Sequence, residues 1–122
     1  MSETTIDLSA STTLKIILRA ATGASLTFNL TRDGAALPIT TATIKYMAGL
    51  STPLTKTVGA GITITDGPNG QFTLAFTAAD TSGQNASQAV AHECKIQLAG
   101  EEPAMVFEGV LVLETSLFTA MT

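Results

Sequence analysis

The stretch GITITDGPNGQFTLAFTA, residues 61–78, indicates the fold more clearly than any other part of the chain. On both sides of its centre, apolar and small polar residues alternate, a spacing that puts one set of side chains on each face of a β-strand. The centre, DGPNG at 66–70, is rich in residue types that reverse a chain. We therefore predict a β-hairpin with one face in the core. That face carries Ile62, Ile64, Phe72, Leu74 and Phe76.

Similar alternation, bounded by turn residues, predicts further strands along the chain. These strands are 14–19, 25–31, 41–47, 54–58, 91–98 and 104–114, with 54–58 expected at a sheet edge. Residues 78–84 fit a short helical turn, and 85–90 fit either a helical turn or the start of a strand. Short strands at regular spacing without a long helical pattern predict an all-β sandwich or barrel.

The length of 122 residues suits one domain. We expect an N-terminal arm at 1–13, a β-sandwich domain at 14–114 and a C-terminal tail at 115–122. The N-terminus lacks the basic and apolar regions of a signal peptide, and no segment has the roughly 18 apolar residues of a membrane span. The chain is therefore expected to be made and kept in a cytoplasm, without a membrane partner.

Charged residues make up only 13% of the chain, against a typical share of roughly 25%. This low charge predicts a surface that is partly covered by other proteins. The net charge is −4, and the six basic residues are scattered along the sequence. Nucleic acid is therefore not an expected partner, because neutralising phosphates requires clustered Lys and Arg.

Few residues could carry catalysis or bind a metal. His92 is the only histidine and Cys94 the only cysteine, so His-pair and multi-cysteine metal sites are excluded. Cys94 shares the phase of Ile96 and Leu98, which predicts a buried thiol, whereas His92 beside Glu93 is expected at the surface or in an interface. No nucleophile-elbow or phosphate-loop motif is present. We expect no enzyme activity, catalytic residue, cofactor or metal.

The strand predicted at 104–114 is apolar in both of its phases. One phase has Phe107, Leu111 and Leu113, and the other has three valines together with Glu108 and Glu114. The glutamates mark their own phase as outward, so either the domain covers this strand on both sides or its outward face meets another chain. The candidate interface residues are Val106, Val110, Val112, Leu117 and Phe118.

Several segments, taken in order, resemble a family. They are GASLTFNLT at 23–31, DG at 33–34, PITTATI at 38–44, GITITD at 61–66, GQFTLAFTA at 70–78 and EGVLVL at 108–113. Together they resemble an immunoglobulin-like domain found in tailed-bacteriophage virion proteins associated with the tail and baseplate. The resemblance implies an all-β, immunoglobulin-like antiparallel β-sandwich of about seven to eight strands, and it brings no catalytic residue.

The resemblance implies a structural role in a virion tail, baseplate or neck, through self-association and docking to other virion proteins. Such a protein would be assembled in the host cytoplasm. Three alternatives remain: a capsid decoration protein, a carbohydrate-binding adhesin module and a hydrolase. The adhesin would need exposed aromatic side chains, for which Tyr46 and some of the five Phe are the candidates. The hydrolase would need a convergent polar pocket, which the sequence does not indicate.

Overall fold

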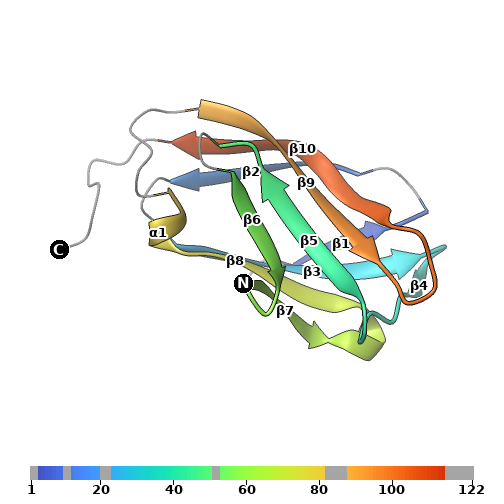
Figure 1. Ribbon diagram of the computed structural model, residues 1–122. Coiled ribbons are helices and arrows are strands. Elements are labelled where there is room, and N and C mark those ends of the chain that lie inside the picture. Colours follow the sequence, from blue (N-terminus) through green and yellow to red (C-terminus); the bar gives the residue numbers. More distant parts are fainter. Residues whose placement is uncertain (1–2, 10–11, 20–22, 51–52, 82–87, 115–122) are drawn as a thin grey trace.

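The computed structural model describes residues 3–9, 12–19, 23–50, 53–81 and 88–114 (Figure 1). Within these residues the regular secondary structure is almost entirely β-strand, which confirms the predicted all-β class. The strands are β1 (Glu3–Asp7), β2 (Thr13–Arg19), β3 (Ala24–Arg32), β4 (Ala35–Ala36), β5 (Thr43–Ala48), β6 (Leu54–Val58), β7 (Gly61–Asp66), β8 (Gln71–Phe76), β9 (Gln88–Gln97) and β10 (Ala104–Glu114). Two short helices, η1 (Gly67–Asn69) and α1 (Ala78–Thr81), lie on either side of β8.

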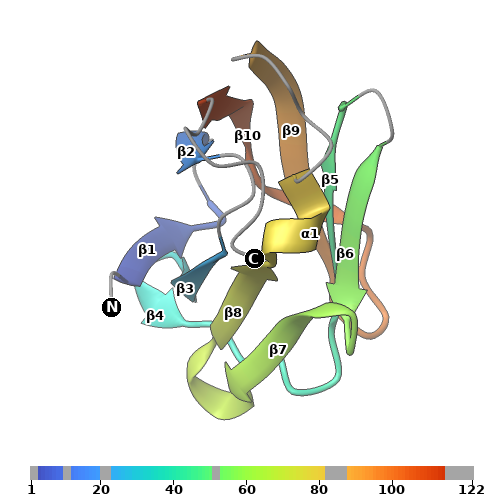
Figure 2. The ribbon, with the colours of Figure 1, turned by 90° about the vertical axis from the view of Figure 1, so that its left-hand side faces the viewer.

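Nine of these strands follow one another in a single hydrogen-bonded sheet, in the order β1-β3-β8-β7-β6-β5-β9-β10-β2, and β4 pairs with β3. The sheet curls, so that β1, β3, β8 and β7 form one layer and β6, β5, β9, β10 and β2 form the other (Figure 2). The apolar core lies between these layers. The ends of the curled sheet are β1 and β2, which are consecutive in the sequence but belong to different layers.

The sheet is mixed, and the expectation of purely antiparallel pairing is wrong at three places. β1 pairs in parallel with β3, β2 with β10, and β6 with β7. The β1–β3 and β2–β10 pairs are parallel because the chain crosses from one layer to the other after β1. As a result, β1 and β2 lie at opposite ends of the sheet, and each runs in the same direction as the strand beside it. The third spans two residue pairs around a tight turn. Strand β6 therefore has neighbours on both sides and is not the edge strand that we expected.

Part of the predicted N-terminal arm belongs to the sheet, because β1 lies within residues 1–13. Ile6 is buried in the core, and the carboxylate of Asp7 ties the end of β1 to the turn after β3. Asp7 Oδ1 accepts from the Ser9 amide at 2.9 Å, and Oδ2 accepts from the Gly34 amide at 2.9 Å. Hydrogen bonds from the Ser9 hydroxyl and amide and from Gly34 hold the pKa of Asp7 well below its ordinary value.

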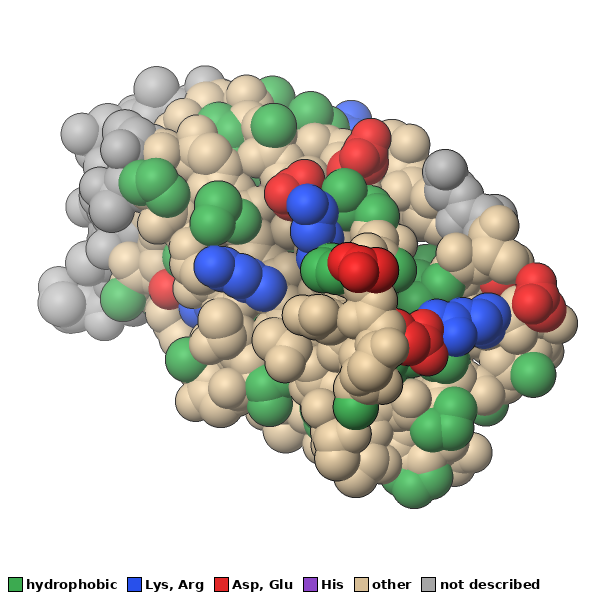
Figure 3. Space-filling model, turned by 45° about the vertical axis from the view of Figure 1, so that its right-hand side comes forward, with side chains coloured by type: hydrophobic (Ala, Val, Ile, Leu, Met, Phe, Trp, Pro, Cys, Tyr) green, Lys and Arg blue, Asp and Glu red, His purple; other side chains and the backbone are tan. Residues whose placement is uncertain are grey.

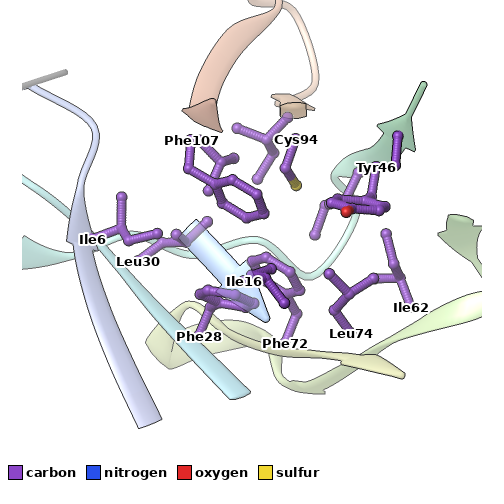
Figure 4. Close-up of a cluster of buried hydrophobic side chains, with 14 of the residues drawn as sticks. Ile6, Ile16, Phe28, Leu30, Tyr46, Ile62, Phe72, Leu74, Cys94 and Phe107 are labelled. Atoms are coloured by element: carbon purple, nitrogen blue, oxygen red, sulfur yellow. The ribbon is translucent and has the colours of Figure 1, made fainter. Parts of the chain in front are cut away.

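The predicted hairpin is present as β7, η1 and β8. Ile62 lies opposite Leu74 and Ile64 opposite Phe72 in antiparallel register. Of the five predicted core residues, all but the partly buried Ile64 are fully inside. The Phe28 ring stacks 5.2 Å from that of Phe72 in its own layer and 5.4 Å from that of Phe107 in the other layer (Figure 4). Such aromatic pairs add to the stabilisation that burial supplies.

One buried ion pair holds α1 against β6. Lys56 Nζ donates to Asp80 Oδ2 at 2.6 Å, and the same oxygen accepts from the backbone amide of Thr77 at 2.7 Å. Burial raises the pKa of Asp80, but these hydrogen bonds outweigh it and leave the pKa below its ordinary value. The carboxylate therefore stays ionised and accepts hydrogen bonds from both groups, so the buried ammonium group of Lys56 is not left unsatisfied.

Candidate functional site: an apolar strip on the outward face of β2, β10 and β9

Strand β10 does not keep a strict two-residue alternation. The β9–β10 register shifts between Met105 and Phe107, and this bulge turns both Val106 and Phe107 toward the core. Val106 is 1% exposed, so its expected outward position is wrong. Beyond the bulge the alternation resumes, with Leu111 and Leu113 buried and Val110 on the outward face.

The two remaining valines lie in an apolar strip that crosses three strands. Val110 is 39% exposed and lies opposite Ala91 of β9, and the half-buried Val112 lies between Ala89 of β9 and Ile17 of β2. We call these five residues the outer strip. Leu117 and Phe118, the other predicted interface residues, lie outside the described residues.

The sequence analysis did not single out Ala89, Ala91 or Ile17 as strip residues, and Ile17 is the largest of the three. Its side chain is 54% exposed, more than that of any other large hydrophobic residue within the described part of the chain. It occupies the outward phase of β2, between Lys15 and Arg19. The sequence does show an isoleucine between two charged residues of the same phase. Only its pairing with Val112 in the sheet shows that Ile17 extends the outer strip.

Charged side chains of both signs surround the outer strip. Arg19 pairs with Glu114 at 3.5 Å at one end, and Lys95 lies 3.9 Å from Glu93 on the neighbouring strand. On the face drawn in Figure 3, acidic and basic side chains lie next to one another among uncharged residues, and neither sign forms a continuous patch. The strip is thus an apolar surface with a mixed polar rim, an arrangement typical of protein interfaces.

His92 is buried, so its expected place at the surface is wrong. It shares the inward phase of β9 with Cys94, and its ring packs against those of Tyr46 and Phe107. Nε2 donates to the Leu14 carbonyl at 2.7 Å, which fixes the tautomer, and Nδ1 accepts from the Tyr46 hydroxyl at 3.0 Å. Burial lowers the pKa of His92. Both nitrogens of the neutral ring are engaged in holding β2, β5 and β9 together.

We predict that acidification weakens the fold through His92. In the unfolded chain His92 binds a proton near its ordinary pKa of 6.5, whereas the folded chain holds that pKa lower. Stability is therefore complete above pH 6.5 and falls as the pH drops from there toward the folded pKa. Urea unfolding on both sides of this value should show the loss in the wild type and a smaller loss in His92→Gln. Equal losses in the two proteins would show that other groups cause the effect.

Cys94 is fully buried, as predicted, and burial raises the pKa of its thiol to about 12. Within the described ranges, no group of three or more His, Cys, Asp or Glu side chains could hold a metal ion. In the same ranges, no helix has the length and apolar character needed to cross a membrane. A cavity of about 290 Å³ lies where the β1–β2 connection meets β10, and Glu108 is the one ionisable group among its described lining residues.

Comparison with solved structures gives a structural likeness to a phage protein domain. No family model matches the chain, and no curated protein matches its sequence. The solved N-terminal domain of phage TP901-1 ORF48 is similar, with a TM-score of 0.55 and 9% sequence identity. The match covers 94% of this chain and 99% of that domain. At this identity the likeness shows that the two chains share a fold, over nearly the whole length of each.

Proposed function

We propose that this chain is a non-enzymatic structural component of a bacteriophage virion, in the tail, baseplate or neck, and that it acts through self-association and docking to other virion proteins. The observation that supports this most strongly is the shared fold with a phage protein domain over 94% of the chain. The low charge of the chain and the outer strip agree with a surface that other proteins cover. Its location would be the virion, after assembly in the host cytoplasm.

The outer strip is the proposed contact surface. Fully burying a valine or isoleucine side chain contributes about 1.5–3 kcal/mol, so Ile17 and Val110 are its main anchors. Each contact is modest, because part of this gain offsets the entropy lost on association. In a closed symmetric assembly the same contact repeats, and several weak contacts together hold a subunit firmly.

No catalytic step is assigned to the chain. A general base needs a free lone pair directed at a substrate, but both ring nitrogens of His92 are bonded within the core. We therefore expect His92 variants to lose stability and not an activity.

We predict that Val110→Lys weakens self-association while leaving the fold intact. The added ammonium group lies at the centre of the outer strip and would have to lose its water on association. The matched control is Thr43→Lys, which adds the same charge to an exposed position of β5 in the same layer. Sedimentation velocity and a thermal melt of each variant separate assembly from stability.

We expect the wild type and the Thr43→Lys control to be oligomeric. The Val110→Lys protein should sediment as a smaller species but melt at nearly the same temperature. If Val110→Lys melts much earlier without first dissociating, Val110 belongs to the domain's own core. A wild-type chain that is monomeric at every concentration would contradict self-association.

A further inference from the structure

One end of the outer strip carries two carboxylates on opposed residues. Glu108 of β10 lies directly across from Glu93 of β9, and both are exposed on the outward face. Like charges in this relation are destabilising unless a cation lies between them. Glu93 has Lys95 at 3.9 Å, but Glu108 forms no ion pair with any of the described residues. At the other end of the strip, Glu114 is already paired with Arg19.

Beside Glu108 lies the cavity of about 290 Å³ at the β1–β2 connection. Its volume is at the lower limit of roughly 300–1,000 Å³ for small-molecule sites, so it suits a single long side chain. Leu8, Ala104 and Met105 supply apolar wall, and Ser9, Thr12 and Thr13 supply hydroxyl groups that can accept hydrogen bonds. Glu108 is the only charged group in this described lining, so the cavity is complementary to a cation with an apolar stem.

We propose that this cavity receives an arginine side chain of a different virion protein, which docks beside the outer strip and leaves the strip to the contact between copies. The arginine stem lies against Leu8 and Met105, and its guanidinium group donates to Glu108 and to the hydroxyl of Thr13. The arginine comes from a different protein, because both arginines of this chain are already paired, Arg19 with Glu114 and Arg32 with Glu101. This inference rests on the proposed function and names the chemistry of the docking partner.

An NMR titration with a short peptide tests the proposal. The probe is acetyl-Val-Arg-Val-amide, and its uncharged control has citrulline in place of arginine. The arginine peptide should shift the amide signals of Thr13 and Glu108 and the methyl signal of Met105, whereas the citrulline peptide should not. Glu108→Gln should weaken binding by about three- to fivefold, since an exposed ion pair contributes little by itself. Glu114→Gln, on the same face of the same strand, should not weaken it.

Two results would overturn the proposal. One is equal binding of the citrulline peptide or equal binding to Glu108→Gln, because the carboxylate would then have no part in recognition. The other is an arginine peptide that leaves the Thr13 and Met105 signals in place, because the cavity would then not be its binding site. Neither result bears on whether Val110→Lys changes the oligomeric state, so a failure here is distinguishable from a failure of the proposed function.

Discussion

Replacing Leu74 with aspartate is expected to leave the chain unfolded. Leu74 is fully buried in β8, opposite Ile62 in the hairpin register. Truncating a buried leucine to alanine costs about 2–5 kcal/mol, and a carboxylate at the same place adds the cost of burying a charge or of keeping it protonated. The total stability of a domain is about 5–15 kcal/mol, so this single change removes most or all of it.

The matched control for Leu74→Asp is Thr63→Asp, which introduces the same group at an exposed position of β7. Circular dichroism melts should show a cooperative transition for the wild type and for Thr63→Asp, and none for Leu74→Asp. A Leu74→Asp protein that melts like the wild type would mean that this face of the hairpin is not the core.

The second large effect is expected from Gly109→Ala in β10. Gly109 has a φ of +154°, and a Cβ atom there would lie 2.3 Å from the Leu14 carbonyl oxygen of β2. The strained backbone costs about 1–3 kcal/mol, and pushing β2 away adds about 1–3 kcal/mol of overpacking. The same carbonyl accepts the hydrogen bond from His92, so moving it also disturbs that buried contact.

Gly100→Ala separates these two costs. Gly100 has a φ of +76°, but a Cβ atom there would have nothing within 4 Å. Gly100→Ala should therefore show the backbone cost alone. Urea unfolding should give Gly109→Ala a clearly lower free energy of unfolding than Gly100→Ala. If the two variants are equally stable, the close approach of β2 to Gly109 is not a constraint on the fold.

The strands that the sequence predicted are those with local signals. The hairpin of β7 and β8 has alternation and turn residues within one short stretch, so its register could be predicted without knowing the rest of the fold. β1 could not be predicted as a strand, because it has few apolar residues. It is held in the sheet by pairing with β3 and by the hydrogen bonds that Asp7 accepts from residues 33 and 34. Parallel pairing likewise depends on how the chain crosses between layers, which no local pattern records.

The candidate site was predictable in part. Val110 and Val112 could be assigned to the outward face because they share the phase of Glu108 and Glu114, and β10 alternates regularly beyond its bulge. Val106 was assigned wrongly because one extra residue in a bulge reverses the phase of the residues before it. The inward position of His92 could not be predicted, because an imidazole can be buried only where hydrogen-bond partners satisfy its nitrogens. Those partners, Tyr46 and Leu14, come from strands that are distant in the sequence.

Immunogold electron microscopy of virions tests the central claim most directly. Antibodies raised against the folded chain would be applied to particles purified from a culture of the strain that encodes it. If the chain is a structural component, gold particles should lie on intact virions at a constant position on the tail, baseplate or neck, and preimmune serum should leave those particles unlabelled. Virions that carry no label, while the chain is found only in the soluble fraction of the same lysate, would contradict the account.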